Sequence, residues 1–256
     1  IENLRAAQEH LKIVNLGATA IGTTVTAAPG YPELAVKNLA ELTGIDFKNS
    51  EDLIAATSDC GAYMTLSSAI KGLAVKMTKV CNDIRLLASG PRCGLKEINL
   101  PQLQPGSSIM PGKVNPVAAE VANQASFLAI GLDTTVMLAA SAGQLELNVM
   151  EPVITFALYT QMKVMTNACD TLRTKLVEGV TANTERCKDY VMNSIGIVTL
   201  LKPHFGYQKC AAIAKEGYTT GKSLHQIVVD EQHLMTQAEW DATFNTQNLI
   251  HPKFVK

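Results

Sequence analysis

The chain has 256 residues, a formal net charge of −1 and 47% hydrophobic residues. A charge this close to zero provides no basic surface for nucleic acid or for an anionic membrane, so neither partner is expected. Aromatic residues make up only 5% of the chain, and its many aliphatic residues favour packed helices over a β-sandwich. The length allows one large domain, or a large domain and a small one.

The six cysteines have none of the spacings of a metal site, and no bound metal is expected. Several of them occupy apolar positions of expected helices, which indicates buried free thiols and a reducing, cytoplasmic environment. No basic-then-apolar leader opens the sequence, and no uncharged apolar run is long enough to span a bilayer.

The first elements alternate between helices and turns. Residues 1–14 are expected to form the end of a helix, and a glycine-rich turn follows over 17–23. A short helix is predicted over 33–43. A long helix is predicted over 51–88, because apolar residues repeat every seven positions in two rows: Leu66, Leu73, Val80 and Leu87, and Ile70, Met77 and Ile84.

Three stretches with helical patterns carry a single charge each: Asp59 within 53–70, Asp133 within 121–145, and Glu151 within 147–162. Pro152 is expected to kink the third helix or to mark its start. Helices with so few charges are buried on most sides. They predict a bundle in which several copies of the chain pack together, with one thick single-chain helical domain as the alternative.

From about residue 183 the charges return and the helices shorten. The pattern predicts helices over 207–217 and 223–231 and a last helix that starts with a capping box of Thr236 and Glu239. We therefore divide the chain into a central helical-bundle domain over 1–185 and a small helical domain over 186–256.

Residues 106–116, with the sequence GSSIMPGKVNP, carry the clearest chemistry of the chain. Glycine and proline predict a shaped loop, which can bring backbone N–H groups close to an anion. With the hydroxyls of Ser107 and Ser108, the ammonium of Lys113 and the carboxamide of Asn115, the loop has the groups to take a proton from a carbon beside a carboxylate. The alternative is that residues 106–116 are a surface loop whose serine and lysine side chains are only solvated and have no catalytic role.

A phosphate-binding loop does not fit this segment. Pro111 stands where that motif requires glycine, and Val114 follows Lys113 where the motif requires serine or threonine.

GSSIMPGKVNP resembles the signature loop of the fumarase/aspartase superfamily, and the resemblance extends from about Asn15 to His251. Met150-Glu151-Pro152 favours the aspartase branch, since fumarases usually carry a Phe-Lys-Pro type of sequence there. Thr24-Val25-Thr26 departs from the family's usual Gly-Leu-Asn. Four further segments resemble the aspartase branch: AATSDCGAYM (55–64), NDIRLLASGPR (82–92), EINL (97–100) and GQLELNVMEPVI (143–154).

The resemblance implies an all-α fold, with a long-helix bundle and a small C-terminal helical domain. It implies a cytoplasmic homotetramer, without organic cofactor, whose active sites are shared between subunits. The implied reaction is the reversible deamination of L-aspartate to fumarate and ammonia through an aci-carboxylate. Close to half of such a protein precedes the position of Ile1, so we expect a carboxy-terminal portion that is inactive alone.

The resemblance also implies a role for each loop residue. Ser107 corresponds to the general base, Ser108 to a substrate or oxyanion contact, and Lys113 and Asn115 to the groups that bind the carboxylate. Gly106 supports the loop. Glu120 would pair with a histidine of another subunit, although capping of the helix dipole explains a carboxylate there equally well.

Two other functions stay open. A fumarase would use the same carbanion chemistry with water as the leaving group, and a non-catalytic helical assembly protein would need only the bundle. The intact Ser107, Lys113 and Asn115 argue against the second.

The remaining polar residues favour structural roles. Gln144, Glu146 and Asn148 are expected on the third helix in buried networks. Arg92 is expected in a salt bridge at a helix end, with an anion anchor as the alternative. The five histidines have no metal-like spacing and are expected to be solvated or capping residues: His10, His204, His225, His233 and His251.

Overall fold

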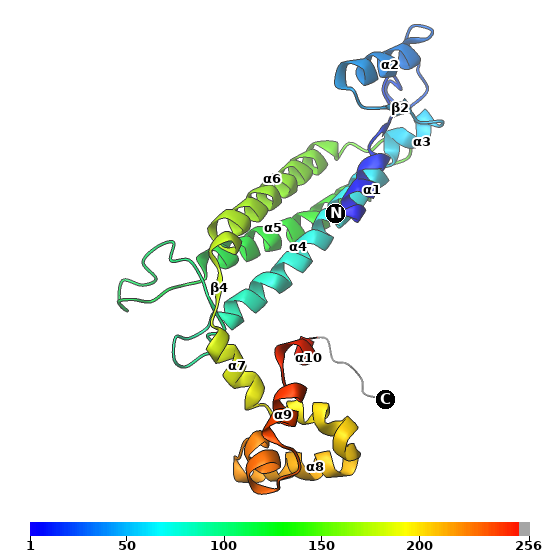
Figure 1. Cartoon of the computed structure of the whole chain (residues 1–256). Coiled ribbons are helices and arrows are strands. Elements are labelled where there is room, and N and C mark those ends of the chain that lie inside the picture. The colour runs from blue at the N-terminus through cyan, green and yellow to red at the C-terminus, as the bar shows by residue number, and fades with distance from the viewer. Residues whose placement is uncertain (251–256) are drawn as a thin grey trace. The chain divides into compact units, whose positions relative to one another are not determined.

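The computed structural model describes residues 1–250, and the chain divides into two compact units between Thr181 and Ala182 (Figure 1). Helices dominate both units, and every strand in the described residues is only two residues long. The predicted all-α class, with a long-helix bundle and a small helical domain, is confirmed. No helix within residues 1–250 is long and apolar enough to cross a membrane.

Three long helices form the bundle of the first unit: α4 (Gly61–Leu87), α5 (Val117–Ala140) and α6 (Glu151–Lys175). They lie side by side along most of their length (Figure 1). Small side chains let helix axes approach closely, and alanines of α5 supply much of the packed surface. Near the start of α5 the buried cluster consists of Cys81, Ala118, Ala119, Ala122, Ala168 and Leu176.

Shorter elements precede the bundle. Helix α1 (Glu2–His10) packs on α4, and strand β1 (Ile13–Val14) pairs in parallel with β2 (Lys48–Asn49). Helix α2 (Tyr31–Thr43) confirms the helix predicted over 33–43, with Pro32 in its first turn.

Three short elements lie beside the long helices. Helix α6 leads into the 3₁₀ turn η1 (Val177–Gly179). Strand β3 (Ile98–Asn99), in the connection between α4 and α5, pairs with β4 (Thr181–Ala182).

The prediction of one continuous helix over 51–88 is wrong. Helix α3 (Leu53–Ser58) ends before α4 begins, because Asp59 adopts an extended backbone with φ of −81° and ψ of 119°. The Asp59 Oδ1 atom accepts a hydrogen bond from the backbone N–H of Gly61 at 2.9 Å, which replaces a helical hydrogen bond.

The two apolar rows of α4 differ in burial. Ile70, Met77 and Ile84 all pack into the bundle, as predicted. Of the first row, Val80 is 53% exposed, whereas Leu66 and Leu73 pack against the buried core.

The predicted helix containing Gln144, Glu146 and Asn148 is also wrong, because these residues lie in the loop between α5 and α6. Asn148 is buried, and its Nδ2 atom donates to the carbonyl oxygens of Ala139 and Ala140 at 3.0 and 3.1 Å. It thus adds side-chain hydrogen bonds to carbonyls at the end of α5. Pro152 lies in the first turn of α6 and starts that helix rather than kinking it.

A polar cluster crosses the middle of the bundle. Asp133 of α5 accepts hydrogen bonds from Ser67 at 2.7 Å, Ser68 at 3.3 Å and Lys71 at 2.5 Å, all on α4. Gln161 of α6, which is fully buried, donates to the Ser67 hydroxyl at 3.1 Å. Since buried polar groups are costly without partners, this cluster fixes how the three helices align.

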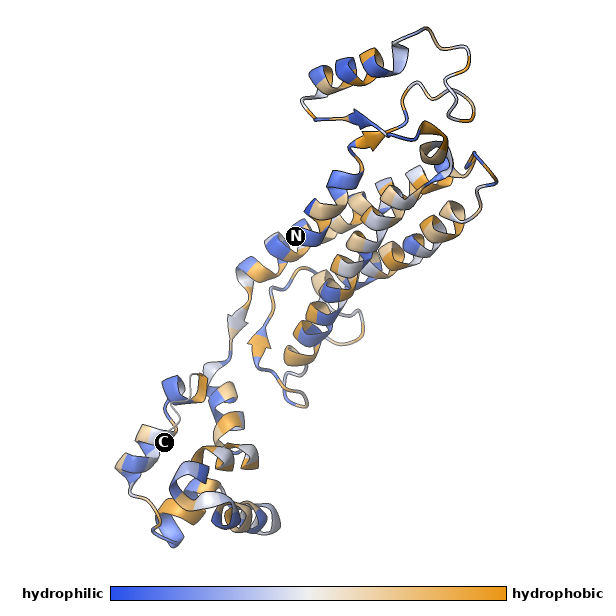
Figure 2. Ribbon diagram, turned by 90° about the vertical axis from the view of Figure 1, so that its right-hand side faces the viewer, coloured by the Kyte–Doolittle hydropathy of each residue, from blue (hydrophilic) through white to orange (hydrophobic). Residues whose placement is uncertain are grey.

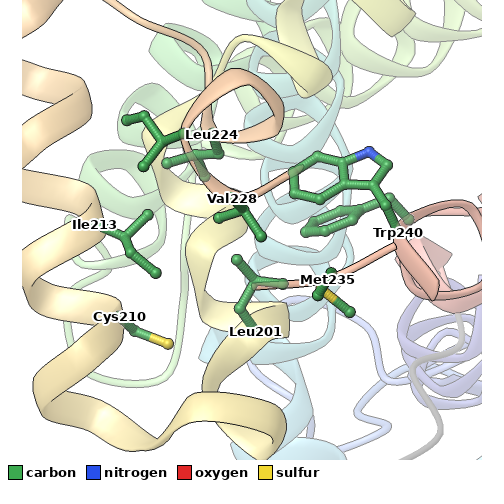
Figure 3. Packing of buried hydrophobic residues seen from close by; sticks show 9 residues of the cluster. Leu201, Cys210, Ile213, Leu224, Val228, Met235 and Trp240 are labelled. Atoms are coloured by element: carbon green, nitrogen blue, oxygen red, sulfur yellow. The ribbon is translucent and has the colours of Figure 1, made fainter. Parts of the chain in front are cut away.

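The second unit consists of short helices around an apolar core. Figure 3 shows the core, in which Trp240 packs against Phe244 with ring centroids 4.0 Å apart. The predicted capping box of Thr236 and Glu239 is confirmed at the start of α9. The helical segments are α7 (Thr184–Met192), η2 (Ile195–Leu201), α8 (Lys202–Thr220), the π-helical turn η3 (Gln226–Glu231), α9 (Gln237–Thr243) and α10 (Thr246–Ile250).

Helix α8 is longer than the predicted 207–217. Gly206, with φ of 73° and ψ of 172°, interrupts its first turns, so the regular helix starts after it.

Replacing Asp133 by alanine is expected to lower the free energy of unfolding by about 2 kcal/mol, because Lys71 and Ser67 lose their common acceptor. Urea unfolding followed by circular dichroism measures the change. The matched control is Asp170→Ala, which removes the exposed ion pair with Arg173 and should cost less than about 0.5 kcal/mol. Equal effects of the two substitutions would contradict the role of the cluster.

Candidate active site

The signature loop, residues 106–116, is closed at its base by backbone contact. A Cβ atom added to Gly106 would lie 1.9 Å from the carbonyl oxygen of Lys113, so only glycine fits there. The Nδ2 atom of Asn115 donates to the carbonyl oxygen of Gly106 at 2.5 Å. These contacts hold the two ends of the loop together and fix the shape of the turn between them.

Ser107 is placed where its hydroxyl oxygen meets backbone donors. The N–H groups of Ile109 and Met110 both donate to its Oγ atom at 3.1 Å. These two donors come from the residues that follow the serine pair. Two N–H donors stabilise negative charge on the oxygen, which favours loss of its proton. Ser108 is exposed beside it.

A cavity of about 860 Å³ lies next to the loop, and Lys113, Asn115 and Glu120 all line it. Ser107, Ser108 and Gly106 are not among the residues that line this cavity. Glu120 lies in the first turn of α5, where it complements the helix dipole. Its carboxylate forms no ion pair with any residue between 1 and 250.

The end of α4 and the segment that follows it also line the cavity. Arg85, Ser89 and Lys96 line it, together with Asn99 and Gln102. This segment is tightly folded, because Ser89 accepts a hydrogen bond from the N–H of Leu95 through its Oγ atom at 3.1 Å and one from the N–H of Lys96 through its carbonyl at 2.9 Å. These two hydrogen bonds close the turn between Ser89 and Lys96.

Sequence reasoning missed Arg85 and Lys96 as cavity residues. It singled out Arg92, which does not line the cavity. The signal available in the sequence was the segment NDIRLLASGPR, which matched the superfamily but carried no indication of which arginine faces the signature loop. Arg85 and Lys113 line the same cavity although 27 positions of the sequence separate them.

A second, smaller cavity of about 420 Å³ lies near the start of α4 and is lined by His10, Asp59, Tyr63 and Glu151. Burial raises the pKa of the Tyr63 hydroxyl, and the carboxylate of Glu151 raises it further. Within residues 1–250 no group of three or more His, Cys, Asp or Glu side chains could hold a metal ion.

The other histidines make local contacts. In the second unit His225 bonds Gln237 at 2.8 Å, and His233 bonds the carbonyl of Val229 at 2.9 Å. His204 stacks loosely on Phe205, with ring centroids 6.1 Å apart. His251 lies outside the described residues.

The fold and the loop agree with the comparisons to known proteins. Residues 1–131 match the family described as "Lyase", and residues 197–251 match "Fumarase C C-terminus". The chain therefore belongs to this lyase family of the fumarase/aspartase superfamily.

Curated relatives are similar over nearly the whole chain. The chain is 56% identical to aspartate ammonia-lyase of Escherichia coli strain K12 over 254 residues, which are 99% of the chain and 53% of that protein. It is 50% identical to aspartate ammonia-lyase of Helicobacter pylori strain 26695, over 100% of the chain and 54% of the relative. The chain thus spans about half the length of the curated relatives it matches.

Two solved structures share the fold. Fumarate lyase:delta crystallin from Brucella melitensis bound to cobalt superposes with a TM-score of 0.92 at 39% identity, covering 98% of this chain and 55% of that one. Recombinant class II fumarase from Schistosoma mansoni superposes with a TM-score of 0.90 at 30% identity, covering 99% of this chain and 56% of that one.

Gly106→Ala is expected to open the base of the loop, because the new methyl group would overlap the Lys113 carbonyl. Amide hydrogen exchange should show the N–H groups of Ile109 and Met110 exchanging at least about tenfold faster. The matched control is Gly131→Ala on α5, where nothing lies within 4 Å of the added atom. Unchanged exchange in Gly106→Ala would show that the loop does not depend on this contact.

Proposed function

We propose that the chain belongs to an aspartate ammonia-lyase, which converts L-aspartate reversibly to fumarate and ammonia. The observation that carries the proposal is the 56% identity to the Escherichia coli enzyme over 99% of the chain. The closed signature loop with Ser107, Lys113 and Asn115 supports it, since these residue types match the chemistry of the reaction.

The difficult step is removal of a proton from the carbon beside the side-chain carboxylate of aspartate. The electron pair of the C–H bond moves into that carboxylate, which becomes an aci-carboxylate with two negative charges. The pair then returns to form the carbon–carbon double bond as the C–N bond breaks and ammonia leaves. The enzyme must stabilise the dianion more strongly than the substrate.

Ser107 is the proposed base. An ordinary serine hydroxyl is a weak base, because its alkoxide is scarce at neutral pH. The two N–H groups that point at Ser107 Oγ, with the ammonium of Lys113 on the same loop, lower the cost of the negative charge. Ser107 takes the proton from carbon, and Ser108 contacts the substrate beside it.

Lys113 and Asn115 are the proposed carboxylate-binding groups. Lys113 supplies a full positive charge to the aci-carboxylate. The Nδ2 group of Asn115 has two N–H donors, of which one bonds Gly106 and the other can bind the carboxylate. Asn115 therefore both stabilises the loop and binds the substrate in this proposal. Gly106 supports the loop, and Glu120 either orients a partner's histidine or caps α5.

We also propose that the protein is a homotetramer with active sites shared between subunits. Large apolar side chains lie exposed along α5 and α6, including Phe127 at 55%, Phe156 at 65% and Tyr159 at 68% exposed, and Figure 2 shows orange segments along the bundle helices. Exposed apolar surface of this extent favours burial against further copies of the same helices. No organic cofactor is needed by the proposed chemistry, and the six free cysteines support a cytoplasmic location.

A fumarase is the second candidate, favoured by the fold shared with the Schistosoma mansoni fumarase. The lower identity of 30% to that protein, against 56% to the Escherichia coli ammonia-lyase, makes it the weaker one.

The experiment uses a chimera in which this chain replaces the matched region of the Escherichia coli aspartate ammonia-lyase. We expect the chimera to form fumarate from aspartate and not from malate. Ser107→Ala should lower kcat by about 10²–10⁴-fold, the usual contribution of a general base, with the substrate still bound. Absorbance of fumarate measures the rates.

The control for that substitution is Ser141→Ala, at the exposed end of α5, which should leave kcat unchanged. Turnover of malate alone by a folded chimera would favour the fumarase. Full activity of Ser107→Ala would remove Ser107 as the base.

The tetramer is tested by multi-angle light scattering of the chain. Phe156→Glu with Tyr159→Glu should shift the mass from four copies towards one, because buried charges are costly at an apolar interface. Leu42→Glu on α2, a residue that is 86% exposed, is the matched control and should leave the mass unchanged. A monomeric wild-type chain would contradict the proposal.

A further inference from the structure

Met110 connects Ser107 to the cavity beside the signature loop. Its backbone N–H donates to Ser107 Oγ at 3.1 Å, and Met110 is one of the residues that line the cavity of about 860 Å³. The carbonyl oxygen of Met110 also accepts a hydrogen bond from the N–H of Lys113 at 3.3 Å. Met110 is therefore hydrogen-bonded both to the proposed base and to the proposed carboxylate-binding lysine.

The hydrogen bond between Met110 and Lys113 closes a four-residue turn with the sequence MPGK. Proline in its second position and a glycine with φ of 78° in its third are the features of a type II turn. The preceding turn is closed by Ser107 Oγ, which accepts from the N–H groups of Ile109 and Met110. Met110 thus belongs to both turns, and a change at this residue affects both.

The side chain of Met110 is open to solvent. At 52% it has the largest exposed fraction of the nine methionines of the chain, all of which lie within residues 1–250. Met137 on α5 is 48% exposed, whereas Met165 is 3% exposed inside the bundle. An oxidant must reach the thioether sulfur to react with it, so an exposed methionine reacts before a buried one.

We propose that Met110 is a reversible oxidation site, at which a hydroperoxide forms methionine sulfoxide and thereby loosens the signature loop. The oxidation and its effect on the loop are independent of the proposed function. The loss of turnover that follows rests on the proposed function, because it assigns the base to this loop.

The reaction is a transfer of one oxygen atom. The Met110 sulfur attacks the terminal oxygen of the hydroperoxide, the O–O bond breaks and an S–O bond forms. The proton of that oxygen passes to the leaving oxygen, which departs as an alcohol, or as water when the oxidant is hydrogen peroxide. Sulfur is oxidised and the peroxide is reduced. A methionine sulfoxide reductase reverses the step, in which two thiols form a disulfide and the oxygen leaves as water.

The sulfoxide affects the loop because it replaces an apolar thioether with a polar hydrogen-bond acceptor. In the unmodified loop Ser107 Oγ is the acceptor for the N–H groups of Ile109 and Met110. The new oxygen is on the side chain of Met110 itself and competes for these donors, and its negative partial charge attracts the ammonium of Lys113. Both effects remove groups that stabilise negative charge on Ser107.

The alternative is an accessible methionine whose oxidation has no consequence. Met137 serves as the reference for this case, because it is exposed to nearly the same extent but lies in the regular helix α5. A comparison of the two residues separates exposure of the sulfur from control of the loop.

The test treats the chain with tert-butyl hydroperoxide and then with dithiothreitol, which reduces sulfenic acids and disulfides of the free cysteines but leaves methionine sulfoxide in place. Peptide mass spectrometry should show Met110 oxidised at least about fivefold faster than Met165. Amide hydrogen exchange at residues 109 and 110 should then be at least about fivefold faster than before treatment. Treatment with methionine sulfoxide reductases for both epimers should restore the slow exchange.

Two variants assign the effect to one sulfur. Met110→Leu should make exchange at residues 109 and 110 insensitive to the peroxide, whereas Met137→Leu should respond as the wild-type chain does. Each treated sample is compared with the same variant before treatment, so an effect of the leucine itself cancels. Circular dichroism shows whether the treated chains are folded.

Three results would overturn the proposal. The first is oxidation of Met110 no faster than that of Met165. The second is unchanged exchange in a folded chain whose Met110 is fully oxidised. The third is an equal response to the peroxide in Met110→Leu and in the wild-type chain.

Kinetics in the chimera separate this proposal from the proposed function. Peroxide followed by dithiothreitol should lower kcat for aspartate at least about tenfold, and less than about twofold in the chimera with Met110→Leu, each relative to its own untreated rate. If the chimera turns over aspartate at an unchanged rate after Met110 is oxidised, the proposed function stands and the control of turnover by Met110 fails. If oxidation of Met110 speeds exchange in the loop but no aspartate is deaminated, the oxidation site stands and the proposed function fails.

Discussion

The packing of α4 against α5 is the constraint on which the candidate site depends. Small buried side chains, among them Cys81, Ala118 and Ala122, let the end of α4 lie close to the start of α5. The chain that joins these helix ends must then fold back over a short distance. It does so in two tight turns, one over 88–96 and one over 106–116, and the cavity lies between them.

Within that arrangement, backbone N–H groups and charged side chains occupy different places. The N–H groups of Ile109 and Met110 surround one hydroxyl, whereas full charges stand on the cavity walls at Lys113 and Arg85. Such an arrangement suits a reaction in which negative charge grows on the substrate, because fixed dipoles and cations need not reorganise as it forms. Glu120 is the one acidic group on the cavity wall and keeps its charge unpaired within residues 1–250.

The bundle has a cluster of hydrogen-bonded polar side chains in its centre and exposed apolar side chains on its surface. The cluster around Asp133 aligns the three long helices, while Phe156 and Tyr159 remain largely exposed on α6. One chain therefore aligns its helices through polar contacts but leaves apolar area uncovered. The sparse charges of the sequence indicated this exposed apolar area, which the proposed association with further copies would bury.

The sequence by itself determined the helical class, the shaped loop and the capping box at Thr236, because each depends on residues close together in the chain. The helix prediction from local sequence failed at Asp59, because its side chain accepts a backbone hydrogen bond in place of a helical one. It also failed around Gln144, where a loop has the residue pattern of a helix. The tertiary structure alone decided that Arg85, and not Arg92, lines the cavity together with Lys113. The shared cavity depends on the close packing of the end of α4 against the start of α5, and no local pattern of residues encodes it.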